Sequence, residues 1–126
     1  MKKCILILLL LSISNTFAQT VSEDIFGQWQ LQTLQVDNDK LTAKEAFETN
    51  NVFQIYSENN QFEGIVGEKN NKGTWKISDD QKSVYIKLDI QKEGQEFTIT
   101  KLTDTELELY FLDNDQEITF SYVKKM

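Results

Sequence analysis

The most constraining feature of this chain is a series of about eight short segments in which apolar and polar residues alternate, running from Phe26 to the C-terminus. The alternation is clearest where apolar residues occupy every second position from Val84 to Ile90. Clusters of Asn, Asp, Gly and Lys separate the segments and are typical of turns. Because such strands bury one face and expose the other, the pattern predicts antiparallel sheet with one dry side.

The connections between these segments are short, so segments adjacent in sequence are expected to pair as antiparallel neighbours in space. An up-and-down meander most simply closes on itself, because closure removes both unpaired edges. We therefore predict an all-β fold in which about eight strands form a closed or nearly closed barrel. A sandwich of two sheets is the alternative. The polar stretch from Gly67 to Lys72 is predicted to be a loop.

The first segment, Phe26 to Val36, changes phase along its length. The apolar positions up to Leu31 share one face, whereas those from Leu34 onward share a face that is out of step with it. A slip within one strand predicts a β-bulge or bend. After this strand, a Thr-x-x-Glu capping box predicts one short helix within residues 41–47.

Residues 1–18 have the three-part layout of a secretory signal peptide: a basic start, an apolar run from Ile5 to Ile13, and small residues ending at Ala18. The run is shorter than the roughly 20 residues of a spanning helix, so we expect no membrane span after cleavage. Cys4 precedes the run, which argues against a lipid anchor. The predicted divisions are a signal peptide over 1–18 and a barrel domain over 19–126, exported to the periplasm or outside the cell.

The composition excludes several classes of chemistry. The chain has no His, its only Cys is Cys4, and all 13 basic residues are Lys. His-based acid–base catalysis, Ser-His-Asp triads and His-ligated zinc are therefore absent, and we expect no enzyme activity, metal or cofactor. The formal net charge of −7 argues against nucleic acid as a partner, since phosphates are bound by dense basic patches.

Three short motifs resemble known sequences. Residues 27–31, GQWQL, resemble the first-strand Gly-x-Trp signature of lipocalins. Residues 73–77, GTWKI, and 97–109 are similar to a mid-chain strand and a late hairpin of small bacterial lipocalin-like domains. The resemblance implies a lipocalin-like β-barrel across the mature chain. Lipocalins pack a late Arg over the first-strand Trp, and Lys124 is the nearest stand-in here.

The predicted barrel interior supplies the candidate ligand-binding residues. Apolar residues in phase with one another make up this set: Phe53, Ile55, Phe62, Trp75, Ile77, Ile86, Leu88, Phe97, Leu109 and Phe120. Such a set suits a small lipophilic ligand, but it equally suits a filled core. Gly27 and Trp29 are predicted to close the base of the barrel, because Trp brings a large apolar body.

Two functions are therefore expected as alternatives. The first is a binding module that holds a small hydrophobic molecule in the barrel. The second is a filled barrel that acts as an interaction module or inhibitor by binding a secreted or cell-surface protein. For the second, Tyr85 and Tyr110 on the outward face are the candidate contacts.

Overall fold

The computed structural model describes residues 22–125, and the predicted signal peptide lies outside that range. Residues 22–125 begin with a helical turn at 22–24 and then form nine strands and the short helix α2: β1 (Gly27–Val36), β2 (Asp39–Thr42), α2 (Ala43–Phe47), β3 (Val52–Tyr56), β4 (Gln61–Val66), β5 (Lys69–Ile77), β6 (Ser83–Leu88), β7 (Gln95–Leu102), β8 (Glu106–Asp113) and β9 (Gln116–Lys125). All pairings between the strands are antiparallel, as the short connections predict.

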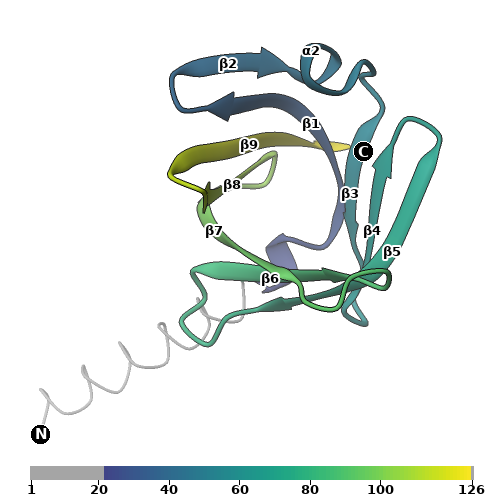
Figure 1. Cartoon of the computed structure of the whole chain (residues 1–126). Helices are drawn as coiled ribbons and strands as arrows, with labels where there is room; N and C mark the ends of the chain where they lie inside the picture. The colour runs from purple at the N-terminus through teal and green to yellow at the C-terminus, as the bar shows by residue number, and fades with distance from the viewer. Residues whose placement is uncertain (1–21, 126) are drawn as a thin grey trace, which may run out of the picture.

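The sheet closes into a barrel of eight strands (Figure 1). The order from β3 to β9 follows the sequence, and β9 pairs back onto β1. β2 lies outside this ring and shares one edge of β1 with β3: residues 27–30 of β1 pair with β3, and residues 33–36 pair with β2. The closed barrel is therefore confirmed over the two-sheet sandwich, and β2 is an additional strand that the sequence pattern did not predict.

The phase slip in the first strand corresponds to a β-bulge. On β9, the partners of Leu31 and Thr33 are the adjacent residues Tyr122 and Ser121, so Gln32 is the extra residue of β1. A bulge of this kind bends the strand and increases its twist. β1 stays paired with β9 on both sides of the bulge, while its other edge changes partner from β3 in the first half to β2 in the second half.

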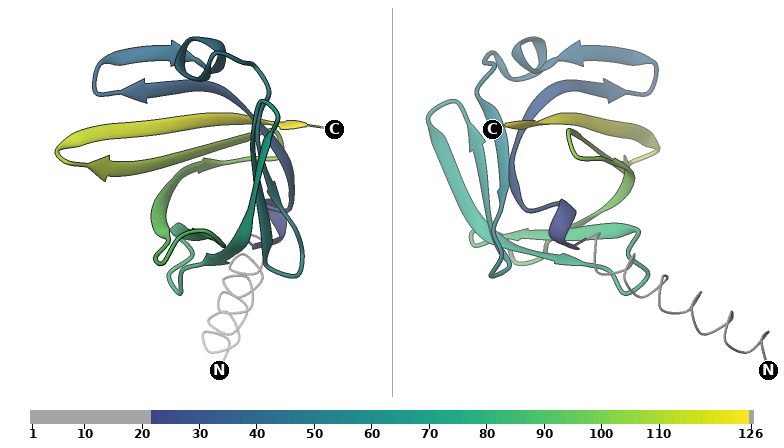
Figure 2. Two further views of the ribbon diagram at one scale, coloured as in Figure 1. Left: turned by 45° about the vertical axis from the view of Figure 1, so that its right-hand side comes forward. Right: turned by 180° about the vertical axis from the view of Figure 1, so that it is seen from behind.

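The predicted helix is present as α2 and begins with the predicted capping box. The Thr42 hydroxyl accepts a hydrogen bond from the Glu45 backbone N–H at 3.1 Å, and the Glu45 carboxylate accepts one from the Thr42 N–H at 2.9 Å. The helix ends at Glu48, whose φ of 64° is left-handed and stops the helix. α2 lies at one end of the barrel, which we call the open end, and the short helical segment at residues 22–24 lies at the other, the closed end (Figure 2).

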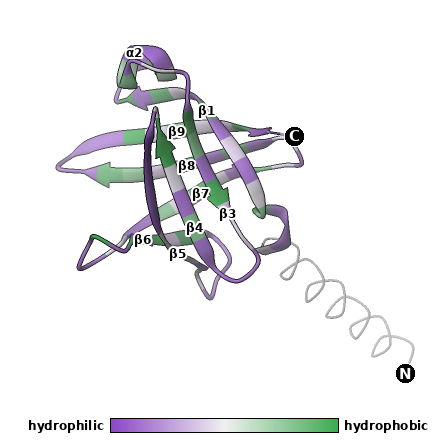
Figure 3. Cartoon of the chain, turned by 90° about the vertical axis from the view of Figure 1, so that its right-hand side faces the viewer, coloured by the Kyte–Doolittle hydropathy of each residue, from purple (hydrophilic) through white to green (hydrophobic). Residues whose placement is uncertain are grey.

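The closed end holds the densest part of the hydrophobic core. The largest fully buried side chains are Trp29, Tyr56, Ile25, Leu107, Leu109 and Val84. Figure 3 shows hydrophobic and hydrophilic residues interspersed along β3 and β4, and buried and exposed positions alternate along β5 from Asn71 to Lys76. Burial of one face of each strand thus supplies the stability of a domain that has no disulfide among its described residues.

Two boundaries differ from the sequence prediction. β5 begins at Lys69, so most of the stretch from Gly67 to Lys72 is strand and only a tight turn remains. Its residues pair with β4 in continuous register, from Val66 opposite Lys69 onward, although they carry no apolar alternation. β6 ends at Leu88, and Ile90, which continues the alternation in sequence, is 81% exposed in the next loop.

β3 faces the opposite way from the prediction. Gln54 is the partner of Trp29 on β1, so Gln54 shares the inward face with that buried ring. Ile55 pairs with Gln28 and therefore lies on the outer face, which makes its placement in the barrel interior wrong. Phe53 belongs to the same outer row as Ile55. The pattern misleads here because both faces of this strand carry apolar residues, and Tyr56 rather than Ile55 is needed to fill the closed end.

Candidate functional site

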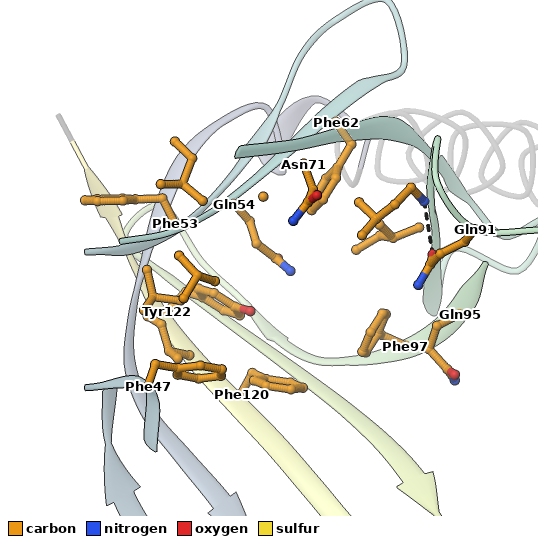
Figure 4. A pocket seen from close by; sticks show the side chains of 17 residues that line it. Phe47, Phe53, Gln54, Phe62, Asn71, Gln91, Gln95, Phe97, Phe120 and Tyr122 are labelled. Atoms are coloured by element: carbon orange, nitrogen blue, oxygen red, sulfur yellow. Dashed lines mark hydrogen bonds between the residues drawn. The ribbon is translucent and has the colours of Figure 1, made fainter. Parts of the chain in front are cut away.

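A cavity of about 260 Å³ occupies the barrel interior towards the open end. Its wall is mainly aromatic and aliphatic, and Phe47 of α2 contributes to it (Figure 4). Six of the predicted interior residues line it: Phe53, Phe62, Ile86, Leu88, Phe97 and Phe120. The ring of Phe53 points away from the cavity, as the register of β3 requires.

The other predicted interior residues lie elsewhere. Trp75 belongs to the closed end, where its ring makes edge contacts with Phe26 and Tyr56 at centroid distances of 5.8 and 5.6 Å. Its indole N–H donates to the Ser57 carbonyl at 3.0 Å. Leu109 is fully buried and Ile77 packs against the core, and neither lines the cavity. The barrel is thus filled at one end and hollow at the other.

Trp29 and Lys124 form the closure of the filled end. The Trp29 indole N–H donates to the Ile25 carbonyl at 2.9 Å, and the Lys124 ammonium lies 4.6 Å from the centroid of the Trp29 ring. The same ammonium donates to the Phe26 carbonyl. Gly27 has a φ of 123°, and a methyl group there would lie 2.8 Å from the Lys124 side chain. Lys124 therefore occupies the place over the Trp that the lipocalin resemblance assigns to an Arg.

Replacing Lys124 by Met is expected to lower the free energy of unfolding by about 1–2 kcal/mol, because the variant loses a cation–π contact and a charge-assisted hydrogen bond. Lys125→Met is the matched control, since Lys125 is the exposed next residue on the same strand. Urea denaturation of both variants measures the difference. Equal unfolding midpoints for the two variants would show that Lys124 does not hold the closure.

Sequence reasoning missed the amide residues of the cavity wall. Gln54 and Asn71 line the cavity, together with Gln91 and Gln95 near the open end, and Tyr122, in phase with Phe120 on the last strand, also lines it. Gln54 could have been found only from the other phase of its strand, in which Val52 and Tyr56 face inward. Asn71 lies in the stretch predicted to be a loop, so no face was assigned to it. The cavity is therefore apolar with a few polar groups, as is common for small-molecule sites.

Comparison with known proteins agrees with this geometry. Residues 25–109 match the family model described as a lipocalin-like domain. The chain belongs to this lipocalin-like family. A crystal structure of a lipocalin-like protein from Bacteroides uniformis matches 82% of this chain and 99% of that chain, with a TM-score of 0.61 and 16% sequence identity. At that identity the likeness concerns the fold alone. No curated protein matches the chain.

A lipocalin-like barrel has an interior that can hold a small ligand, and the cavity of this protein lies in that interior. Within residues 22–125, this lipocalin-like protein has no helix of the length and hydrophobicity required to span a membrane. The signal peptide predicted over 1–18 lies outside the described residues.

Two buried tyrosines of the lipocalin-like barrel have perturbed acidities. Burial raises the pKa of Tyr56 well above its usual value, with a smaller contribution from the nearby Tyr122. Burial likewise raises the pKa of Tyr122. Both hydroxyls are consequently neutral at physiological pH. The Tyr56 hydroxyl donates to the Gln54 side-chain carbonyl oxygen at 2.6 Å, which fixes the orientation of that amide.

The raised pKa values of Tyr56 and Tyr122 predict that the protein loses stability in alkali. Above pH 10 the unfolded chain loses the phenolic protons that the native state retains, so the unfolding free energy falls as the pH rises. Each tyrosine contributes a slope of up to about 1.4 kcal/mol per pH unit. Urea denaturation between pH 8 and 11 measures the slope, and Tyr122→Phe is expected to reduce it by about half. An unchanged slope in that variant would contradict the assignment.

Acidic side chains dominate the turns around the open end. The acidic residues of these turns and of α2 are Asp37, Glu45, Glu48, Glu68, Asp89, Glu93 and Asp115. The basic residues of the same segments are Lys44 and Lys92. A negative potential at the mouth of the cavity follows, and it lowers the local concentration of anions.

Proposed function

We propose that this protein is a binding module that holds a small hydrophobic molecule in the cavity at the open end of the barrel. The observation that carries the proposal is the cavity itself, which lies inside the barrel beside a closed end that is filled by buried side chains. Its wall includes the rings of Phe62, Phe97 and Phe120, which suit an aliphatic or aromatic ligand. The volume of about 260 Å³ lies just below the ~300–1,000 Å³ of typical ligand pockets, which favours a small ligand.

Gly64→Val tests this function by filling the cavity. Gly64 lines the cavity between two inward residues of the neighbouring strands, Gln54 and Asn71. A valine side chain at this position would therefore enter the hollow space. A methyl group at Gly64 would lie 3.4 Å from the Phe62 ring, an ordinary contact that the fold can accommodate. We expect the variant to fold and to lose at least tenfold in affinity for a lipophilic probe.

The probe is N-phenyl-1-naphthylamine, an uncharged dye whose fluorescence rises in apolar surroundings. Tryptophan emission is a poor reporter here, because Trp29 and Trp75 lie at the closed end, away from the cavity. Thr74→Val is the matched control, since Thr74 is an exposed residue of the adjacent strand and is expected to leave binding unchanged. Equal affinities of wild type and Gly64→Val would refute binding in the cavity.

The alternative function, an interaction module, has weaker support. Tyr85 and Tyr110 are its candidate contacts, and both hydroxyls bond within the chain. The Tyr85 hydroxyl accepts from the Gly94 N–H at 2.8 Å, and the Tyr110 hydroxyl donates to the Glu117 carboxylate at 3.3 Å. No enzyme activity forms part of the proposal.

We further propose that the protein is exported, on the basis of the signal-like composition of residues 1–18. Mass spectrometry of the protein expressed at full length in a Gram-negative host tests this. The expected result is a mature protein in the periplasm or medium that begins at Gln19. An intact N-terminus in the cytoplasm would contradict export.

A further inference from the structure

We propose that the cavity selects ligands with an uncharged carbonyl-bearing head group, such as an amide, which Gln54, Asn71 and Tyr122 receive by hydrogen bonding. The inference rests on the proposed binding function and specifies the polar end of the ligand. The three side chains come from β3, β5 and β9, and all three line the cavity. Figure 4 shows the two amides directed into the cavity, with the Tyr122 hydroxyl facing the same space.

The strand register brings the two amides together. Gln54 pairs with Gly64 across β3 and β4, and Gly64 pairs with Asn71 across β4 and β5. The three residues therefore form one row on the inward face, with the amides on either side of a glycine. Because Gly64 has no side chain, the space between the amides stays open, and a ligand group can enter it.

The side chains of Gln54, Asn71 and Tyr122 have hydrogen-bonding capacity that the rest of the protein leaves unused. Tyr56 donates to the carbonyl oxygen of the Gln54 amide, so the Gln54 amide nitrogen is left to donate into the cavity. Within residues 22–125, the side chain of Asn71 and the hydroxyl of Tyr122 make no hydrogen bond. Tyr122 as a whole is only 5% exposed, and its hydroxyl faces the cavity. A ligand oxygen can accept hydrogen bonds from these donors.

The charges around the cavity argue against an anionic head group. No charged side chain is present in the cavity wall formed by the described residues. A carboxylate bound there would lose its hydration without gaining an ion pair. Lys124, the inward-facing lysine of β9, is already engaged with Trp29 and the Phe26 carbonyl at the closed end. The acidic turns at the open end further disfavour the approach of an anion.

A competition experiment with two isosteric ligands tests the inference. In this experiment, octanamide and octanoate each compete with N-phenyl-1-naphthylamine for the wild-type protein at pH 7, where octanoate is ionised. We expect octanamide to bind at least tenfold more tightly than octanoate. Asn71→Leu is expected to weaken octanamide binding by about tenfold relative to its effect on dye binding, since the dye accepts no hydrogen bond from that amide.

Asn70→Leu is the matched control, because Asn70 lies on the outer face of the same strand and bonds to Glu63 there. It is expected to leave both affinities unchanged. Tyr122→Phe is a second test variant that keeps the ring and removes only the hydroxyl. It is expected to weaken octanamide binding more than dye binding. Circular dichroism verifies that each variant is folded.

The outcomes separate this inference from the proposed function. Equal affinities for octanamide and octanoate, or equal effects of Asn71→Leu and Asn70→Leu, would overturn the head-group inference while dye binding still supports the cavity. Failure of the dye and of both ligands to bind wild type would overturn the two proposals together. The head-group inference would be supported if the wild type prefers octanamide and if both Asn71→Leu and Tyr122→Phe reduce that preference.

Discussion

Trp29→Ala is expected to lower the free energy of unfolding by about 3–5 kcal/mol, the range for truncating a large aromatic residue in a core. Trp29 is fully buried, donates to the Ile25 carbonyl and lies beneath the Lys124 ammonium. Its removal would leave a void at the closed end and free the lysine from its contact. A domain of this size is stable by only about 5–15 kcal/mol, so the variant would lose a large share of its stability.

Urea denaturation followed by circular dichroism measures this loss. Leu112→Ala is the control, because Leu112 is 58% exposed and its truncation is expected to change stability by less than about 0.5 kcal/mol. Trp29→Phe retains part of the apolar body and should fall between the two. A loss below about 1.5 kcal/mol for Trp29→Ala would show that other residues close the barrel.

Gly73→Ala is expected to destabilise the barrel by about 3 kcal/mol or more, at the upper end of the range for overpacking. The new methyl group would collide with the Lys87 carbonyl oxygen and would lie 2.7 Å from the Leu88 Cα atom. Both atoms belong to the backbone of β6, so no side-chain rotation relieves the contact. β5 and β6 would have to separate at the point where Gly73 pairs with Leu88.

Gly64→Ala is the matched control for this prediction, since it places the same methyl group on the neighbouring strand. The nearest atoms to that methyl group are in the Phe62 ring, at 3.4 Å, and the Asn71 carbonyl oxygen, at 3.9 Å, so we expect a change within about 1 kcal/mol. Thermal unfolding of the two variants measures the contrast. Similar melting temperatures for Gly73→Ala and Gly64→Ala would contradict the close approach of β5 and β6.

Much of the fold follows from the sequence because the hydrophobic pattern has a period of two. Where only one face of a strand is apolar, as in β6 with Ile86 and Leu88, the prediction places the correct side chains at the cavity. The capping box at Thr42 and the phase slip after Leu31 also have local causes, and both are confirmed. The prediction fails for β3, where Val52 and Tyr56 compete with Phe53 and Ile55 for the inward face.

The candidate site was less predictable than the fold, for a physical reason. Asn71 carries no apolar signal, and it becomes strand because β5 continues the hairpin with β4. Which residues line a cavity and which fill a core depends on how the two ends of the barrel are packed. Trp75 illustrates this, because its contacts with Phe26 and Tyr56 place it in the filled end.

Local sequence patterns are enough to predict the class of this protein: short alternating strands, tight turns, a Gly-x-Trp start, and a composition without His or Arg that excludes chemistry dependent on those residues. Those properties are local, and local patterns are read directly from the order of residues. The tertiary structure decided that one end is filled by Trp29 and the other left hollow, and that Gln54, Gly64 and Asn71 share one inward row. Cross-strand register and packing bring these residues together, and both arise only when the barrel closes.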